Sequence, residues 1–127
     1  MPEVVLWKHE PDEHDYPAAA AYLSLLAEED LVADLLGQLR AAPVALAKAK
    51  DLLRASRLEL LPGDNQHVAK DLHKVRLGTK LSPVLVVRGD SQRGLPLVVA
   101  DGYHRICASY HLGEDIDIPY KMAALPG

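Results

Sequence analysis

The sequence has almost no cysteine, since Cys107 is alone among 127 residues. One cysteine excludes an internal disulfide and a cysteine-rich zinc site, and we therefore expect a reducing, cytoplasmic compartment. Charges interrupt every apolar run well before the roughly 18–20 residues that a membrane helix needs. The first residues, MPEVVLWKHEPDEHD, are acidic where a signal peptide would be basic. These absences predict a protein that neither enters nor crosses a membrane.

The composition is that of an ordinary globular chain, 49% hydrophobic and 25% charged, with room for one compact domain. Its charge is uneven. Residues 1–42 carry 9 acidic and 2 basic side chains (net −7), whereas residues 43–127 carry 9 acidic and 12 basic (net +3). An anionic ligand is therefore expected to bind the second part, although the overall charge of −4 argues against a general nucleic-acid binder.

Two helices are predicted in the N-terminal part. Residues 10–16 are acidic and lack periodicity, which indicates a linker. Between Ala18 and Arg40 leucines recur at spacings of three to five, typical of two helices or of one helix bent near residues 28–30. We expect this hairpin to cover a sheet; the alternative is a subunit interface, with a homodimer formed through these helices. Residues 1–44 are thus predicted to be a helical extension packed on a single unit, residues 45–127.

The second part begins with an ambiguous segment, because residues 45–53 fit the spacing of a helix as well as the alternation of a strand. After a turn, Asp64 is the expected N-cap of a helix that ends at Gly78. The apolar stripe of this helix comprises Val68, Leu72 and Val75. Lys70 and Lys74 point away from that stripe.

Two apolar runs, residues 83–87 and 95–100, predict neighbouring strands that are covered on both faces. A helix is predicted over residues 103–112, because Tyr103, Ile106, Cys107 and Tyr110 form an apolar stripe that ends before Gly113. Alternation over residues 116–122 predicts a last strand. In that strand Pro119 indicates an edge or a bulge. The fold class is therefore α+β, a small mixed sheet with packed helices and an N-terminal helical hairpin.

The most informative segment is the turn in which the second strand runs directly into a helix. It carries Asp101, Gly102, His104 and Arg105. Helix N-termini attract phosphate, glycine permits close approach to the backbone, and arginine and histidine supply charge-assisted donors or a mobile proton. The alternative is purely structural, with Asp101 as an N-cap and the two basic residues in solvent. Cations at a helix N-terminus are unfavourable unless an anion compensates them, which favours a functional role.

This order of elements, with LVVADGYHR at the turn and CASYHLG and DIPYKM after it, resembles the ParB/sulfiredoxin superfamily over residues 62–122. The resemblance implies a nucleotide site, with ATP, ADP or CTP as ligand and Mg²⁺ as a candidate cofactor. It implies that Gly102, His104 and Arg105 contact phosphate, that Asp101 positions them or a metal, and that the helix carrying Lys70 and Lys74 also faces the ligand. Base recognition is expected from loops such as residues 88–94.

The chain departs from the superfamily's best-known members. Tyr103 stands where sulfiredoxin has its cysteine, so we do not expect sulfinic-acid repair. We find no room for the helix-turn-helix of ParB and expect no sequence-specific DNA binding. The acidic residue of the free-serine kinases has no clear counterpart among Glu59, Asp64 and Asp71.

The leading hypothesis is a nucleotide- or phosphate-binding protein, with Asp101 and His104 as catalytic candidates if phosphoryl transfer occurs. Whether any reaction is catalysed stays open. The alternative is a non-enzymatic interaction module with a vestigial site, whose acidic hairpin docks a basic or apolar partner. A ParB-like nuclease or DNA-associated protein is the third. Histidine spacing predicts no metal site.

Overall fold

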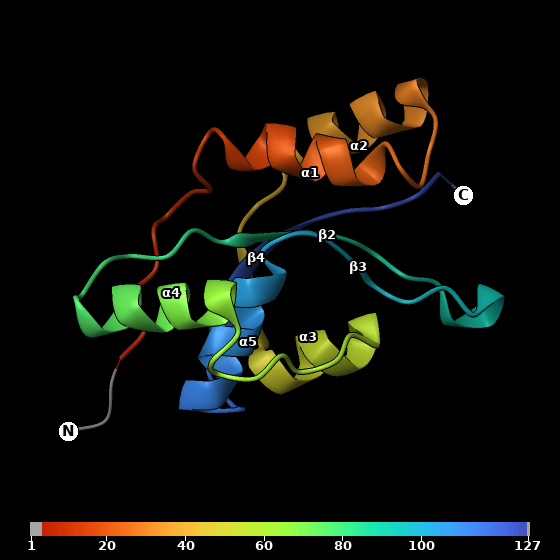
Figure 1. Cartoon of the computed structure of the whole chain (residues 1–127). Helices are drawn as coiled ribbons and strands as arrows, with labels where there is room; N and C mark the ends of the chain where they lie inside the picture. The colour runs from red at the N-terminus through yellow and green to blue at the C-terminus, as the bar shows by residue number, and fades with distance from the viewer. Residues whose placement is uncertain (1–3, 127) are drawn as a thin grey trace.

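The structure, a computed structural model, describes residues 4–126 (Figure 1). Its elements are α1 (Asp15–Leu23), α2 (Glu29–Ala41), β1 (Ala45–Lys48), α3 (Ala49–Ser56), α4 (Gln66–Arg76), β2 (Val84–Val87), a short 3-10 helix η1 (Ser91–Arg93), β3 (Val98–Asp101), α5 (Tyr103–Leu112) and β4 (Asp117–Ala123). The predicted α+β class, with a small mixed sheet and an N-terminal helical hairpin, is confirmed. In the part of the chain that the structure describes, no helix has both the length and the apolar character needed to span a membrane.

The sheet has the strand order β1-β4-β2-β3 and is mixed, because β2 and β4 are parallel while the other pairs are antiparallel. Helices cover both faces: α1 and α2 lie on one side, and α3, α4 and α5 lie on the other (Figure 1). Successive residues of β2 therefore serve two cores. Val84 and Val86 join the α3–α5 side, whereas Leu85 and Val87 join the hairpin side. The prediction of a strand buried on both faces is confirmed.

The hairpin packs on the sheet as expected. Leu23, Leu35 and Leu39 are buried in one cluster with Leu85 and Val87. Burying side chains of this size contributes about 1.5–3 kcal/mol each, so this apolar contact holds the hairpin on the sheet.

On the opposite face, α4 and α5 bury the stripes that periodicity predicted. Val68 and Ile106 are fully buried, and Cys107 is also a core residue. The N-cap of α4 was predicted one residue too early. Asn65, rather than Asp64, accepts backbone hydrogen bonds from the second and third residues of the helix, at 3.0 and 3.2 Å.

Two local predictions are resolved by the structure. Residues 45–53 fitted both patterns because they contain both elements: β1 ends at Lys48 and α3 begins at Ala49. Pro119 lies in β4, an interior strand, so the expectation of an edge is wrong. Pairing of β4 with β2 starts at Tyr120, and the ladder on that side therefore does not extend to the proline, which lacks an N–H.

The interpretation of residues 10–16 as a linker is wrong. Asp15 and Tyr16 are buried and begin α1. A buried lysine, Lys121 of β4, ties this segment to the sheet by donating to Glu10, to the Tyr16 hydroxyl and, at 2.9 Å, to the Arg40 carbonyl oxygen. Segments far apart in the sequence are therefore fixed against one another beside the first turn of α1.

Candidate functional site

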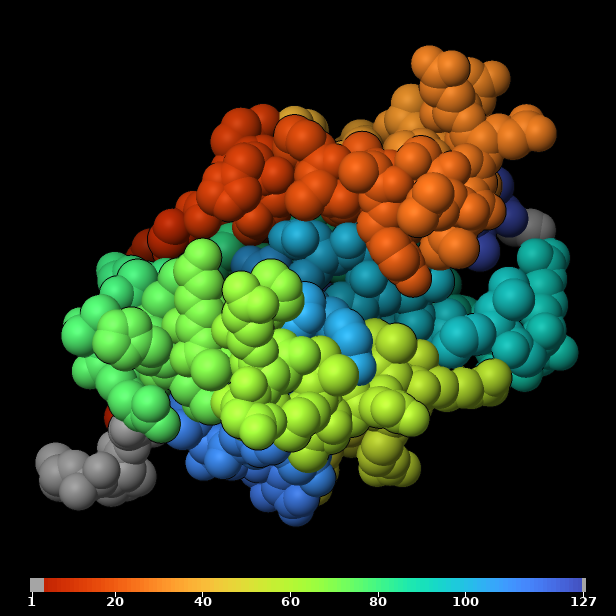
Figure 2. All heavy atoms as spheres, viewed as in Figure 1, coloured from red at the N-terminus to blue at the C-terminus, as the bar shows by residue number. Residues whose placement is uncertain are grey.

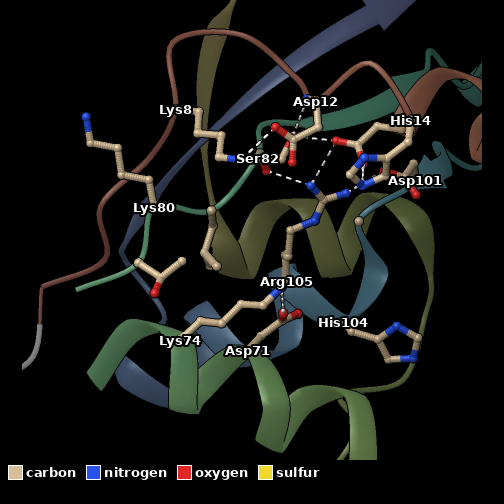
Figure 3. A pocket seen from close by; sticks show the side chains of 14 residues that line it. Lys8, Asp12, His14, Asp71, Lys74, Lys80, Ser82, Asp101, His104 and Arg105 are labelled. Carbon is tan, nitrogen blue, oxygen red and sulfur yellow. Dashed lines mark hydrogen bonds and ion pairs between the residues drawn. The ribbon is translucent and has the colours of Figure 1, made fainter. Parts of the chain in front are cut away.

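A cavity of about 270 Å³ lies where α5 begins (Figure 3). The four residues predicted at the strand-to-helix turn all line it: Asp101, Gly102, His104 and Arg105. Lys74 of α4 lines it too. Lys70, on the same helix, is exposed and is not among the lining residues. Of the two lysines predicted to face the ligand, Lys74 therefore lines the cavity and Lys70 does not.

The guanidinium of Arg105 is held on several sides. One terminal nitrogen donates to Asp101 Oδ2 at 2.5 Å; the other donates to the Ser82 carbonyl oxygen at 2.8 Å and to Asp15 Oδ2 at 3.4 Å. The Ser82 hydroxyl donates to the same oxygen of Asp15 and accepts from the Asp12 amide at 3.0 Å. With its side chain 12% exposed, Arg105 is an oriented member of a network. An anion that binds Arg105 would share the guanidinium with the carboxylates of Asp15 and Asp101.

Sequence reasoning missed Asp12, Asp15 and Ser82. The first two belong to the acidic DEHD segment (residues 12–15), whose acidity was the only local signal. Nothing local connects Asp15 to Arg105, which lies 90 positions further along the chain. The contact exists because α1 packs against β3, which ends at Asp101 just before α5 begins.

The N-terminus of α5 opens on the cavity without a side-chain cap. Its N-cap is Gly102, at φ +113°, and no side chain hydrogen-bonds there. Asp101 is therefore not the N-cap that the structural interpretation assumed; its carboxylate binds Arg105 one turn later. The amides of the first helical turn cannot bond within the helix, and they favour anions.

The packing of β2 against the turn also requires glycine at position 102. A Cβ at this position would lie 2.4 Å from Cγ1 of Val84. The positive φ and the closeness of β2 both require a residue without a side chain. Val84 fills the space on that side of the glycine.

The cavity lining carries four cations and four carboxylates. The cations are Lys8, Lys74, Lys80 and Arg105, and the carboxylates are Asp12, Asp15, Asp71 and Asp101. Lys8 pairs with Asp12 at 2.6 Å, whereas Lys74 approaches Asp71 only to 4.0 Å. Lys80 forms no ion pair with any residue between 4 and 126. Lys74 and Lys80 are thus the cations least engaged with the protein.

Burial shifts the pKa of three titratable groups in the cavity lining, those of His104, Asp71 and Asp101. Burial lowers the pKa of His104 below 6.5, assisted by the His67 ring, whose centroid lies 4.6 Å away. The neutral form of His104 therefore predominates at pH 7. Burial raises the pKa of Asp71, and the nearby Lys74 and Arg105 oppose that shift. A carboxyl group with a raised pKa beside cations is a candidate proton acceptor. Of the three acids compared above with the acidic residue of the free-serine kinases, Asp71 lines the cavity, whereas Glu59 and Asp64 do not.

Within residues 4–126, the structure brings together one group of three side chains able to hold a metal ion: Asp12, His14 and Asp15, with ligand atoms within 4.8 Å of one another. Both carboxylates already have cationic partners, Lys8 for Asp12 and Arg105 for Asp15. Those ion pairs account for the clustering, and we assign no metal there.

The loop expected to recognise a base lies elsewhere. Residues 88–94 follow the end of β2 that pairs with Val98, whereas Asp101 pairs with Leu85 near the other end. The loop lines a separate hollow with the C-terminal residues of the chain and does not line the cavity at α5, so its part in base recognition stays a prediction. Comparison of the chain with protein-family models, with curated proteins and with solved structures gives no match.

Proposed function

We propose that the cavity binds the phosphate groups of a nucleotide. The observation that carries the proposal is the uncapped N-terminus of α5, which opens on a cavity lined by Lys74 and Lys80. Amides and the helix dipole favour an anion at this place, and two weakly engaged ammonium groups add charge-assisted hydrogen bonds. At about 270 Å³ the cavity lies just below the usual range of ligand pockets, roughly 300–1,000 Å³, so we expect it to take the phosphates and to leave the base outside.

The carboxylates of the lining favour a phosphate that carries Mg²⁺. Four carboxylates would repel a bare polyphosphate, and a divalent cation bound to it reverses part of that repulsion. Mg²⁺ takes oxygen ligands, of which Asp71 offers a carboxylate with no close ion pair. ATP, ADP and CTP with Mg²⁺ are the ligands to test.

The resemblance to the ParB/sulfiredoxin superfamily supports the same ligand class and is itself part of the proposal. A reaction is a further step. Asp101, engaged with Arg105, is suited to positioning that guanidinium rather than to accepting a proton. Asp71 is the better candidate base for phosphoryl transfer when its carboxylate is not bound to Mg²⁺, since the two roles exclude one another. His104 is suited to donating or accepting one hydrogen bond.

Replacing Lys74 should weaken nucleotide binding while replacing Lys70 should not. Lys74→Met removes a charge-assisted contact worth about 1.5 kcal/mol or more, equivalent to roughly tenfold in affinity. Lys70→Met removes an exposed charge from the same helix outside the cavity. The measurement is titration calorimetry with ATP, CTP and pyrophosphate, each with and without Mg²⁺.

Equal affinities of the two lysine variants would contradict the placement of the phosphates. If no ligand raises the melting temperature of the wild type at concentrations up to the millimolar range, the proposed function itself fails. Ligand at a hundred times its Kd stabilises a protein by about 2.7 kcal/mol, which a thermal shift readily detects.

Nucleotide affinity should rise as the pH falls through the lowered pKa of His104. Protonation gives this ring a positive charge beside the phosphates, and a bound anion raises the pKa in return. The phosphates titrate in the same range, so the comparison is with His104→Gln, in which the ligand's own titration is unchanged. Identical pH profiles of wild type and variant between pH 5 and 8 would show that His104 does not meet phosphate.

A further inference from the structure

An open apolar groove of about 850 Å³ runs between α1 and α2, away from the cavity. Small or apolar side chains provide most of its lining: Pro17, Ala20, Ala21, Ser24, Ala27, Val32, Ala33 and Leu36. Alanine on both helices lets another helix approach closely, since helix axes pack 8–10 Å apart when the side chains are small. The groove thus offers an open apolar surface against which a third helix could pack.

Large apolar side chains are exposed in the connection between the two helices. Leu25 is 80% exposed and Leu26 is 58% exposed, and Tyr22 is exposed at the end of α1. Figure 2 shows this orange part of the hairpin projecting from the body of the molecule. Adjoining exposed apolar residues beside an apolar groove are typical of a surface that another chain covers.

Acidic residues lie at the end of the groove where α2 begins. Glu28 and Glu29 belong to the groove lining, and Asp30 follows them. None of the three pairs with a cation among residues 4–126. They stabilise the N-terminus of α2, but that role does not require all three. The groove lining contains no basic residue.

We infer that this groove binds a basic amphipathic helix of a partner protein. Leucines or similar residues of the partner helix would fill the apolar groove, and lysines and arginines of the same helix would pair with the acidic residues 28–30. A second copy of the hairpin does not supply these cations. The only basic residue of α1 and α2 is Arg40, which already binds Glu13 at 2.7 Å.

The test uses a synthetic peptide of about 18 residues, with leucine at i, i+3, i+4 and i+7 and lysine or arginine elsewhere. Its fluorescence anisotropy is measured with the full chain. Ala33→Arg, which fills the groove and adds a positive charge, should weaken binding about tenfold or more. The matched control is Ala18→Arg, at an exposed position of α1 outside the groove lining.

Charge pairing is tested by exchanging the signs. Glu28→Lys/Glu29→Lys should lose the basic peptide and gain affinity for a peptide in which glutamate replaces every lysine and arginine; circular dichroism checks that the helices persist. Failure of the basic peptide to bind, equal loss with Ala18→Arg, or indifference to the charge exchange would each overturn the proposal. A wild-type dimer in sedimentation velocity that Ala33→Arg dissociates would assign the groove to a second copy instead. None of these outcomes depends on nucleotide binding.

Discussion

Arg105→Met should destabilise the protein by about 3–5 kcal/mol, because removing one member of a buried ion pair leaves the other charge without compensation. The side chains of Arg105, Asp15 and Asp101 are 12%, 8% and 20% exposed. Methionine keeps the apolar contacts of the arginine stem but leaves Asp101 and the Ser82 carbonyl oxygen without their donor. It also leaves Asp15 without a cation, with only the Ser82 hydroxyl donating to the oxygen that Arg105 contacts. Urea unfolding at pH 7 measures the loss as a lower midpoint with an unchanged slope.

Acid should relieve the penalty of this substitution. Burial already raises the pKa of Asp101, and Arg105 is the main influence that opposes it. Without Arg105 the folded-state pKa rises further above that of the unfolded chain, so the folded variant retains a proton that the unfolded chain releases. The penalty is then complete only above the raised pKa and shrinks as the pH falls through it.

A double-variant cycle identifies the cause. Arg105→Met/Asp101→Asn should be more stable than the sum of the single changes predicts, because the amide carries no charge to bury. Additive losses, or a penalty that does not change between pH 7 and pH 4, would show that Arg105 stabilises through packing alone. The large expected loss also means that Arg105 is a poor probe of ligand binding, and Lys74 and His104 are better ones.

The sequence predicted the parts of the fold that local periodicity encodes. Ile106 and Cys107 lie on a stripe bounded by Gly102 and Gly113, and α5 has those limits. The run of residues 83–87 has no polar residue, as expected for β2, which is buried on both faces. In each case the pattern and the tertiary environment agree, which is why pattern alone sufficed.

Contacts between distant segments could not be predicted in the same way. The carboxylate of Asp15 was hidden in an acidic segment whose partner, Arg105, comes from the other end of the chain. Asp64 and Asn65 are both good capping residues, and only the backbone path selects the second. Lys80, which follows the end of α4, lacks a motif and joins the cavity only through the fold.

Gly102→Ala should cost about 3 kcal/mol, because two penalties act at one position. At φ +113° an L-residue is strained, which costs about 1–3 kcal/mol. The added methyl would also lie 2.4 Å from Cγ1 of Val84 and 3.0 Å from a terminal nitrogen of Arg105. Relieving that contact displaces β2 or the arginine, at about 1–3 kcal/mol more. Urea unfolding gives the total.

Gly37 provides the matched control, since it lies inside α2 and a Cβ there meets nothing within 4 Å. Gly37→Ala should stabilise by about 0.5–1 kcal/mol, the ordinary helix preference for alanine. Adding Val84→Ala to Gly102→Ala removes Cγ1 from this contact, while the Val84 Cβ, 2.8 Å from the added methyl, and the backbone strain stay. Part of the steric penalty is thereby relieved, so the double variant should lose less than the sum of the single losses. Strict additivity would show that Cγ1 of Val84 adds nothing to the cost of a side chain at Gly102, and would assign that cost to the backbone conformation and to the contacts that remain.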